Sequence, residues 1–144
     1  MKTALHELAQ LQIVKACNQL GMQAQMEYVG NGWRADVFIQ YNCKKYAFEI
    51  QLTPQSLKKT QERQEKYIKD GIICCWLFEK EPSRQRLELE DLPIFRLIQE
   101  DDSLMVSLKG RKTLALDIFV KDFITDKIKF CKTLRPLPRV NVVF

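Results

Sequence analysis

The sequence has few of the residues on which several common kinds of site depend. Histidine occurs once, at His6, and the five cysteines include no C-x-x-C pair. A structural zinc site takes four such ligands as a rule, and a serine–histidine or cysteine–histidine catalyst would have to use His6. An odd number of cysteines also argues against a disulfide framework. We therefore expect neither a zinc centre nor a disulfide-stabilised fold.

Long apolar runs, glycine and proline are scarce as well. No segment approaches the roughly 18 consecutive apolar residues that a membrane span requires, and the N-terminus lacks the apolar core and cleavage pattern of a signal peptide. Glycine and proline number five each, which excludes collagen-like or low-complexity sequence. We expect no membrane partner and a reduced, cytoplasmic location.

The composition that remains is that of a globular domain. The 144 residues are 46% hydrophobic, enough for a core, and indicate a single domain over 1–144 with a core at about 1–80 and an extension at about 81–144. The net charge of +5 fits a polyanion partner, although many basic proteins bind none. The charge is uneven, with −4 over 79–102 and +6 over 109–144.

Hydrophobic periodicity predicts the order helix, strand, strand, strand, helix, strand. These elements are expected over residues 2–20, 23–29, 33–40, 44–52, 53–70 and 72–78. Thr53 and Pro54 form the entry signal of the second helix. The last strand is wholly apolar, so Cys74, Cys75 and Trp76 are expected in the core. A strand, helix, strand sequence is typical of a parallel pair.

Beyond residue 80 the patterns are weaker. The apolar run at 93–98 is left without an assigned element, and 103–108 and 127–130 are interpreted as short strands. Residues 113–123 fit a short helix whose inward side chains would be Leu114, Ile118 and Phe123.

The two middle strands alternate in character and bring acidic residues together. In the first, Ala35, Val37 and Ile39 share one face, and Arg34, Asp36 and Phe38 the other; in the second, Tyr46, Phe48, Ile50 and Leu52 oppose Lys45, Ala47, Glu49 and Gln51. If Asn42 and Cys43 form a two-residue turn, Asp36 lies opposite Glu49, with Cβ atoms about 5 Å apart.

Two opposed carboxylates repel each other unless a positive charge lies between them. A divalent cation such as Mg²⁺, which binds one or two carboxylates with water and phosphate, is one solution. The other is that both are solvated strand residues, neutralised by Arg34 or a lysine. Spacing alone does not decide between them.

Four segments of the sequence resemble a known family. WRADVFI at 33–39, AFEIQLT at 47–53, the Arg63-x-x-x-Tyr67 pair and IICCWLF at 72–78 resemble the competence protein CoiA-like family of the PD-(D/E)XK nuclease superfamily. The resemblance implies an α/β (α+β) fold. Its core would be restriction-endonuclease-like, αβββαβ, with a mixed central sheet flanked by helices and a small C-terminal strand and helix extension.

The resemblance also implies roles for individual residues. Asp36 and Glu49 match ligands of Mg²⁺ or Mn²⁺, and the main-chain carbonyl of Ile50 matches a further ligand. Gln51 completes the catalytic set at a position where most of the superfamily has lysine. Glutamine is uncharged and cannot act as a base near neutral pH. An active enzyme would therefore need the metal, or a nearby basic residue, to supply the missing charge.

Further residues are expected around this centre. Glu27 and His6 match supporting positions, with a solvated strand residue and a helix packing residue as the alternatives. The expected DNA-binding residues are Arg34, Arg63, Tyr67, Lys58 and Lys59. For Arg63 an ordinary ion pair on its own helix is the alternative.

The function that the resemblance implies is metal-dependent hydrolysis of DNA, in the processing or recombination of foreign DNA, with recombination proteins as further partners. Two alternatives are open. The chain would be a catalytically weak or inactive DNA-binding module, or a protein-interaction domain whose oppositely charged segments dock a partner or a second copy in a homodimer.

Overall fold

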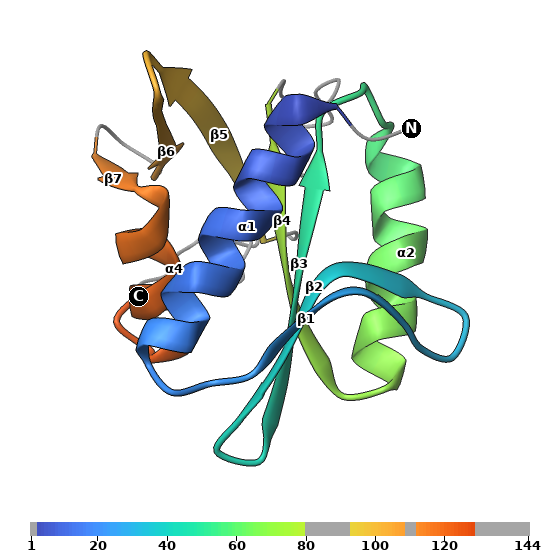
Figure 1. Ribbon diagram of the computed structural model, residues 1–144. Helices are drawn as coiled ribbons and strands as arrows, with labels where there is room; N and C mark the ends of the chain where they lie inside the picture. The colour runs from blue at the N-terminus through green and yellow to red at the C-terminus, as the bar shows by residue number, and fades with distance from the viewer. Residues whose placement is uncertain (1–2, 80–92, 109–111, 129–144) are drawn as a thin grey trace, which may run out of the picture.

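The computed structural model describes residues 3–79, 93–108 and 112–128, and these contain one mixed sheet with helices on both faces (Figure 1). The sheet has seven strands in the order β1-β2-β3-β4-β5-β6-β7. Its elements are α1 (Ala4–Gln19), β1 (Ala24–Val29), β2 (Arg34–Tyr41), β3 (Lys44–Gln51), α2 (Leu57–Lys69), β4 (Ile72–Phe78), β5 (Ile94–Glu100), β6 (Ser103–Ser107), β7 (Thr113–Ala115) and α4 (Leu116–Ile124).

The order of the first six elements confirms the predicted αβββαβ core. Strands β1, β2 and β3 are antiparallel neighbours, whereas β3, β4 and β5 are parallel to one another. The parallel β3–β4 pair is joined through α2, as a strand, helix, strand unit requires. The hairpin of β5 and β6 then extends the sheet, with β7 at its far edge.

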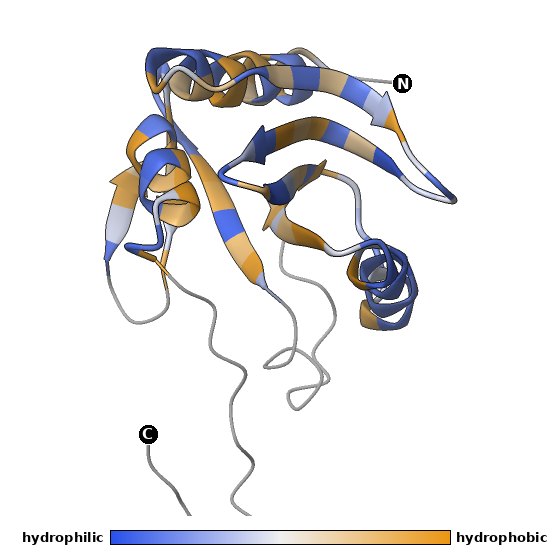
Figure 2. Cartoon of the chain, turned by 90° about the horizontal axis from the view of Figure 1, so that it is seen from below, coloured by the Kyte–Doolittle hydropathy of each residue, from blue (hydrophilic) through white to orange (hydrophobic). Residues whose placement is uncertain are grey.

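Two hydrophobic clusters hold the helices against the sheet. Helices α1 and α4 pack on one face, over inward side chains such as Val37, Phe48 and Leu77. Helix α2 packs on the other face, where Tyr67 meets Trp76. Figure 2, seen from below, shows α2 on the opposite side of the curved sheet from α1 and α4.

From Cys74 to Phe78, strand β4 is buried on both faces, as its apolar sequence predicted, whereas Ile73 near its start is exposed. Cys75 packs in the α1 and α4 cluster, and Cys74 and Trp76 pack in the α2 cluster. Burial raises the pKa of both thiols well above the usual value. These cysteines are therefore protonated packing residues, as expected.

A two-residue turn fixes the register of the β2–β3 hairpin. Tyr41 pairs with Lys44, as predicted, and the pairing continues back to Val37 and Phe48. Asn42 and Cys43 form the turn with φ of 50° and 64°. Two positive φ values are typical of a type I′ turn, whose twist matches that of the strands. This register brings Asp36 and Glu49 to the next position along the pair.

The alternation predicted for β2 is wrong at one position. Ala35 packs in the α2 cluster together with Phe38, whereas Val37 belongs to the opposite cluster. Residues three apart in a regular strand lie on opposite faces, so the strand is irregular between them. Asp36 lies at this irregularity. The register between β1 and β2 places Glu27 opposite Asp36, and Glu27 has a positive φ of 54°.

The predicted start of the second helix is also wrong. Ser56, and not Thr53, is the N-cap, with its Oγ accepting a hydrogen bond from the Lys59 N–H at 3.1 Å. The hydroxyl of Thr53 instead accepts a hydrogen bond from the Gln51 side chain. Because Thr53 is engaged with the end of β3, the helix begins only at Leu57.

The C-terminal half differs from prediction in three places. Residues 94–98 of the unassigned run lie in β5, where pairing with β4 and β6 supplies the backbone bonds. The predicted helix at 113–123 is split, because Thr113–Ala115 form β7 and α4 begins at Leu116. Ile118 is 46% exposed and not inward, whereas Phe123 is buried as expected.

Other expectations for this half fare differently. The strand over 103–108 is confirmed as β6. Lys127 and Ile128 are not in a strand, and 129–130 lie outside the described residues. Much of the two charged segments, at 80–92, 109–111 and 129–144, also lies outside them. Within the described ranges, no helix has the length and apolar character to cross a membrane.

Replacing Cys43 by glycine should stabilise the fold. Cys43 is exposed and has φ of 64°, a conformation that glycine adopts without steric cost. We expect Cys43→Gly to raise the free energy of unfolding by about 0.5–1 kcal/mol, measured by urea denaturation. Cys43→Ala retains the Cβ atom and should bring no such gain. Equal stabilities of the two variants would show that this turn is not strained.

Candidate active site

Asp36 is held at the irregular point of β2 by groups from two neighbouring elements. Its Oδ2 accepts a hydrogen bond from the Ile50 N–H of β3 at 2.7 Å and lies 3.4 Å from His6 Nε2 of α1. The Asp36 carbonyl accepts a hydrogen bond from Gln10 Nε2 at 3.0 Å. The carboxylate is therefore oriented through both its side chain and its backbone.

Glu49 lies beside Asp36 on β3 and is the most deeply buried acidic residue of the site, with 3% of its surface exposed. Its Oε2 accepts a hydrogen bond from the Tyr67 hydroxyl of α2. Its Oε1 is 3.2 Å from Arg63 Nη2. Burying a carboxylate is costly unless it is paired and hydrogen-bonded, and α2 provides both partners.

Burial and the nearby Asp36 carboxylate both raise the pKa of Glu49. Burial is the larger cause, and together they raise the pKa to about 8, although the Arg63 guanidinium and the Tyr67 hydroxyl oppose the rise. Burial and the Glu49 charge also raise the pKa of Tyr67, so its hydroxyl stays protonated. The Asp36 carboxylate therefore lies close enough for its charge to act on Glu49.

Gln51 follows on the same face of β3, as predicted, and is fixed at both ends of its amide. Its Nε2 donates to the Thr53 carbonyl and hydroxyl, both at 2.9 Å. Its Oε1 accepts a long hydrogen bond from Arg63 Nη1 at 3.4 Å. The Gln51 amide thus brings no charge to the site, but it is hydrogen-bonded to Arg63, which carries a positive charge.

Arg63 is the cation at the centre of the site. Besides Glu49 and Gln51, its Nη1 donates to Gln55 Oε1 at 2.8 Å. Its guanidinium carbon lies 4.8 Å from the centre of the Trp76 ring, a cation–π arrangement. With 32% of its side chain exposed, Arg63 faces both the buried carboxylate and the solvent. The alternative of an ion pair within its own helix is not what the structure shows.

The supporting residues lie on the α1 side of Asp36. Glu27 receives a hydrogen bond from Gln10 Nε2 at 2.7 Å and forms an ion pair with Arg34 at 2.9 Å. His6 is one helical turn before Gln10, and its Nδ1 is buried without a hydrogen-bond partner among the described residues. Glu27 is thus linked to Asp36 through Gln10 of α1, and His6 of the same helix lies beside the Asp36 carboxylate.

The expected DNA-binding residues differ in their exposure. Arg34 is largely exposed, and Lys58 and Lys59 are exposed at the start of α2. Tyr67 is buried, with its hydroxyl on Glu49. Its position favours a role in orienting Glu49 over a direct contact with DNA.

Two residues of the site were missed by sequence analysis. Gln10 is fully buried and bonds Glu27 and the Asp36 backbone, and buried Gln55 holds Arg63. A polar residue three positions before buried Ile13, on the apolar stripe of α1, was a signal that Gln10 is inward. Gln55 had none, because it lies in the loop before α2.

The donor chemistry of the site fits a hard divalent cation. Two carboxylates and the Ile50 main-chain carbonyl are oxygen ligands, which Mg²⁺ and Mn²⁺ accept together with water and phosphate oxygens. Each Glu49 oxygen already has a hydrogen-bond partner, but a carboxylate oxygen has two lone pairs and retains one. Nowhere in the described residues do three or more histidine, cysteine, aspartate or glutamate side chains gather as a closed metal site.

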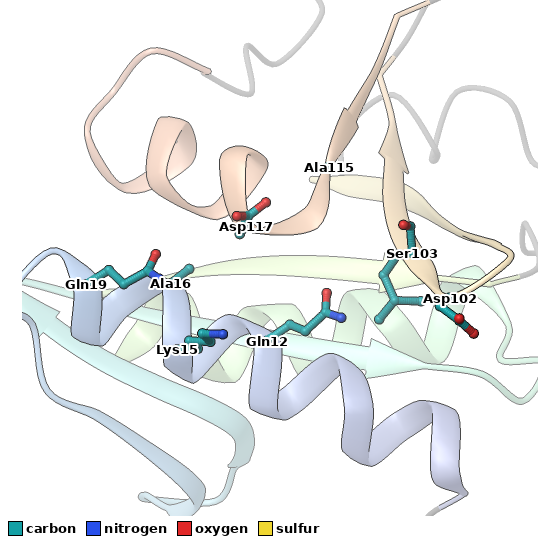
Figure 3. A pocket seen from close by; sticks show the side chains of 9 residues that line it. Gln12, Lys15, Ala16, Gln19, Asp102, Ser103, Ala115 and Asp117 are labelled. Atoms are coloured by element: carbon teal, nitrogen blue, oxygen red, sulfur yellow. The ribbon is translucent and has the colours of Figure 1, made fainter.

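A surface hollow elsewhere on the molecule shares no residue with this site. It lies between α1, β6 and α4, and its polar lining includes Gln12, Lys15, Asp102, Ser103 and Asp117 (Figure 3). The carboxylates and Arg63 are not part of it. The candidate site is therefore defined by its charges and not by this hollow.

The αβββαβ core and the paired carboxylates at its β2–β3 strands define a restriction-endonuclease-like domain. The model of the family described as competence protein CoiA, nuclease-like domain, matches residues 2–123. The chain belongs to this family. A comparison with curated proteins found no match.

The pKa of Glu49 predicts how stability depends on pH. Between about pH 4.5 and 8 the folded chain keeps a proton that the unfolded chain has lost, so stability falls as the pH rises through this window. Glu49→Gln cannot ionise and should lose less stability from pH 5 to pH 9. We expect the difference from wild type to shift in its favour by a few kcal/mol, to order of magnitude.

Urea denaturation at pH 5, 7 and 9 in the presence of a chelator measures this difference. Glu65→Gln, on the exposed surface of α2, is the matched control and should follow the wild type. Parallel pH profiles for Glu49→Gln and the wild type would mean that Glu49 ionises normally in the folded chain.

Proposed function

We propose that the chain is a metal-dependent deoxyribonuclease that hydrolyses phosphodiester bonds in the processing or recombination of incoming DNA. The observation that supports this most directly is that Asp36 of β2 meets β3 beside Glu49, where its Oδ2 accepts a hydrogen bond from the N–H of the next residue, Ile50, at 2.7 Å. In the proposal, Asp36, Glu49 and the Ile50 carbonyl hold Mg²⁺ or Mn²⁺.

When bound, such an ion polarises a phosphoryl oxygen and lowers the pKa of a water molecule. The protein residues fix the geometry around it. The Ile50 N–H and Gln10 orient Asp36, and the Tyr67 hydroxyl orients Glu49. Glu49 must lose its proton to serve as a ligand, and the nearby Arg63 favours that loss.

Arg63 supplies the positive charge that Gln51 lacks. Hydrolysis adds the oxygen of water to phosphorus, breaks one P–O ester bond and places extra negative charge on the phosphoryl oxygens. Arg63 is partly exposed and is held beside Glu49 by its contacts with Gln51, Gln55 and Trp76. In the proposal it donates to a phosphate oxygen as this charge develops.

A second candidate function is a DNA-binding module with weak or no catalysis. It is favoured by Gln51, which cannot act as a base, and by the engagement of both Glu49 oxygens in the structure. Such a module would bind DNA with a steep dependence on salt and little dependence on divalent ions. Recombination proteins are proposed as its partners in that case.

Loss of one carboxylate should abolish cleavage in the first proposal. Asp36→Asn retains the shape of the side chain but removes a charge that holds the cation. We expect cleavage of plasmid and of single-stranded DNA in Mg²⁺ or Mn²⁺ to fall by at least about 10³-fold. Gel electrophoresis of the products measures it, with Glu65→Gln as the matched acidic control. Cleavage that persists in Asp36→Asn, or never occurs in the wild type, would leave the second candidate.

Removing the charge of Arg63 should lower the rate and also shift its pH dependence. Arg63→Gln is expected to reduce kcat by about 10²-fold. Because Arg63 lowers the pKa of Glu49, its loss raises that pKa and moves the rising limb of the rate to higher pH. Lys15→Gln, an exposed lysine of α1, is the control for overall charge. A reduced rate with an unmoved pH profile would assign Arg63 to substrate binding alone.

A further inference from the structure

Three aromatic side chains form a patch on the β1–β2 hairpin, on the same side of the sheet as α2. The patch consists of Tyr28, Trp33 and Phe38. The Tyr28 ring is stacked on Phe38, with centroids 4.3 Å apart and planes 10° apart. Phe38 is 8% exposed, whereas Tyr28 is 37% exposed. Tyr28 therefore covers a buried ring and still presents aromatic surface to solvent.

The patch is held rigidly. Trp33 Nε1 donates a hydrogen bond to Asp70 Oδ2 at 2.6 Å, which ties the hairpin to the C-terminal end of α2. A Cβ atom on Gly30 would lie 2.0 Å from the Trp33 ring, so only glycine permits the ring to lie over the backbone of the turn. An aromatic surface that is already ordered loses little conformational entropy when it binds a ligand.

Positive charge lies next to the patch. Helix α2 has five basic and two acidic residues over Leu57–Lys69, and Figure 1 shows the β1–β2 hairpin beside this helix. Lys66 is exposed on it, and its Cδ lies 4.0 Å from the position of a Cβ on Gly32 in the hairpin turn. An aromatic surface beside a basic helix is complementary to a chain of stacked bases and phosphates.

The patch is also linked to the candidate active site through the buried side chain of Tyr67. The Trp33 ring is 5.2 Å from the ring of Tyr67, and the Tyr67 hydroxyl bonds Glu49. Two contacts therefore separate the patch from the acidic centre.

We propose that this patch binds single-stranded DNA, with one base stacked on the exposed ring of Tyr28 and adjacent phosphates along α2. That the polymer is DNA rests on the proposed function, whereas the stacking rests on the ring geometry. The bases of a duplex are stacked on each other and offer no free face without being flipped out. The patch thus favours single strands over duplexes and selects the substrate of the site.

Binding to a fluorescent 20-nucleotide oligothymidylate, and to a duplex of equal length, tests the proposal with the full chain. A chelator is present throughout, so that cleavage plays no part. We expect the wild type to prefer the single strand, and Tyr28→Ala to bind it about tenfold more weakly with little change for the duplex. Tyr28→Phe retains the ring and should bind like the wild type. Ile118→Ala removes a comparably exposed apolar side chain from α4 as the control.

Thermal unfolding is used to check that each variant is folded. Trp33→Leu is a second variant that removes an aromatic ring from the patch. Single-strand affinity that is unchanged in Tyr28→Ala, or a wild type that prefers the duplex, would overturn the proposal. Its failure is distinct from failure of the nuclease assignment. Loss of binding in Tyr28→Ala supports the patch even if no cleavage is found, and cleavage with unchanged binding refutes the patch alone.

Discussion

A carboxylate buried beside a second carboxylate is the constraint on which the rest of the structure depends. Glu49 is almost fully buried and feels the charge of Asp36, so an unpaired Glu49 would be strongly destabilising. The partners that offset this cost, Tyr67 and Arg63, both come from α2. The packing of α2 against the sheet therefore also positions the side chains on which the chemistry of the site depends.

Arg63 has two possible partners in this arrangement. It is paired with Glu49, and its contacts with the Trp76 ring and Gln55 hold it there. In the proposed enzyme a divalent ion binds the ionised Glu49, which leaves Arg63 available to a phosphate. A lysine at position 51 would have added a second cation beside Arg63, and the neutral Gln51 avoids their repulsion. The neutral side chain at position 51 of β3 is thus compatible with the arginine of α2, whereas a lysine there would be repelled by it.

Sequence reasoning succeeded where a pattern is set by the backbone. The two-residue turn at Asn42 and Cys43 fixed the β2–β3 register, and the spacing of Glu49 and Gln51 fixed their shared face. It failed where tertiary contacts decide: the face of Ala35 depends on the irregularity at Asp36, and the start of α2 depends on the hydroxyl of Thr53 being engaged with Gln51. The aromatic patch was beyond its reach because stacking across a hairpin leaves no periodic signal.

The family match and the geometry together describe a nuclease-like domain. Side chains of α2 bind the acidic centre of this domain, and an aromatic surface lies nearby. The central claim is that Asp36 and Glu49 share one divalent ion. The most direct measurement is a crystal structure of the chain soaked in Mn²⁺, with anomalous scattering recorded for manganese. We expect an anomalous peak between the two carboxylates, with Arg63 withdrawn from Glu49. Full soaking with no peak there, and Arg63 still paired with Glu49, would contradict the claim.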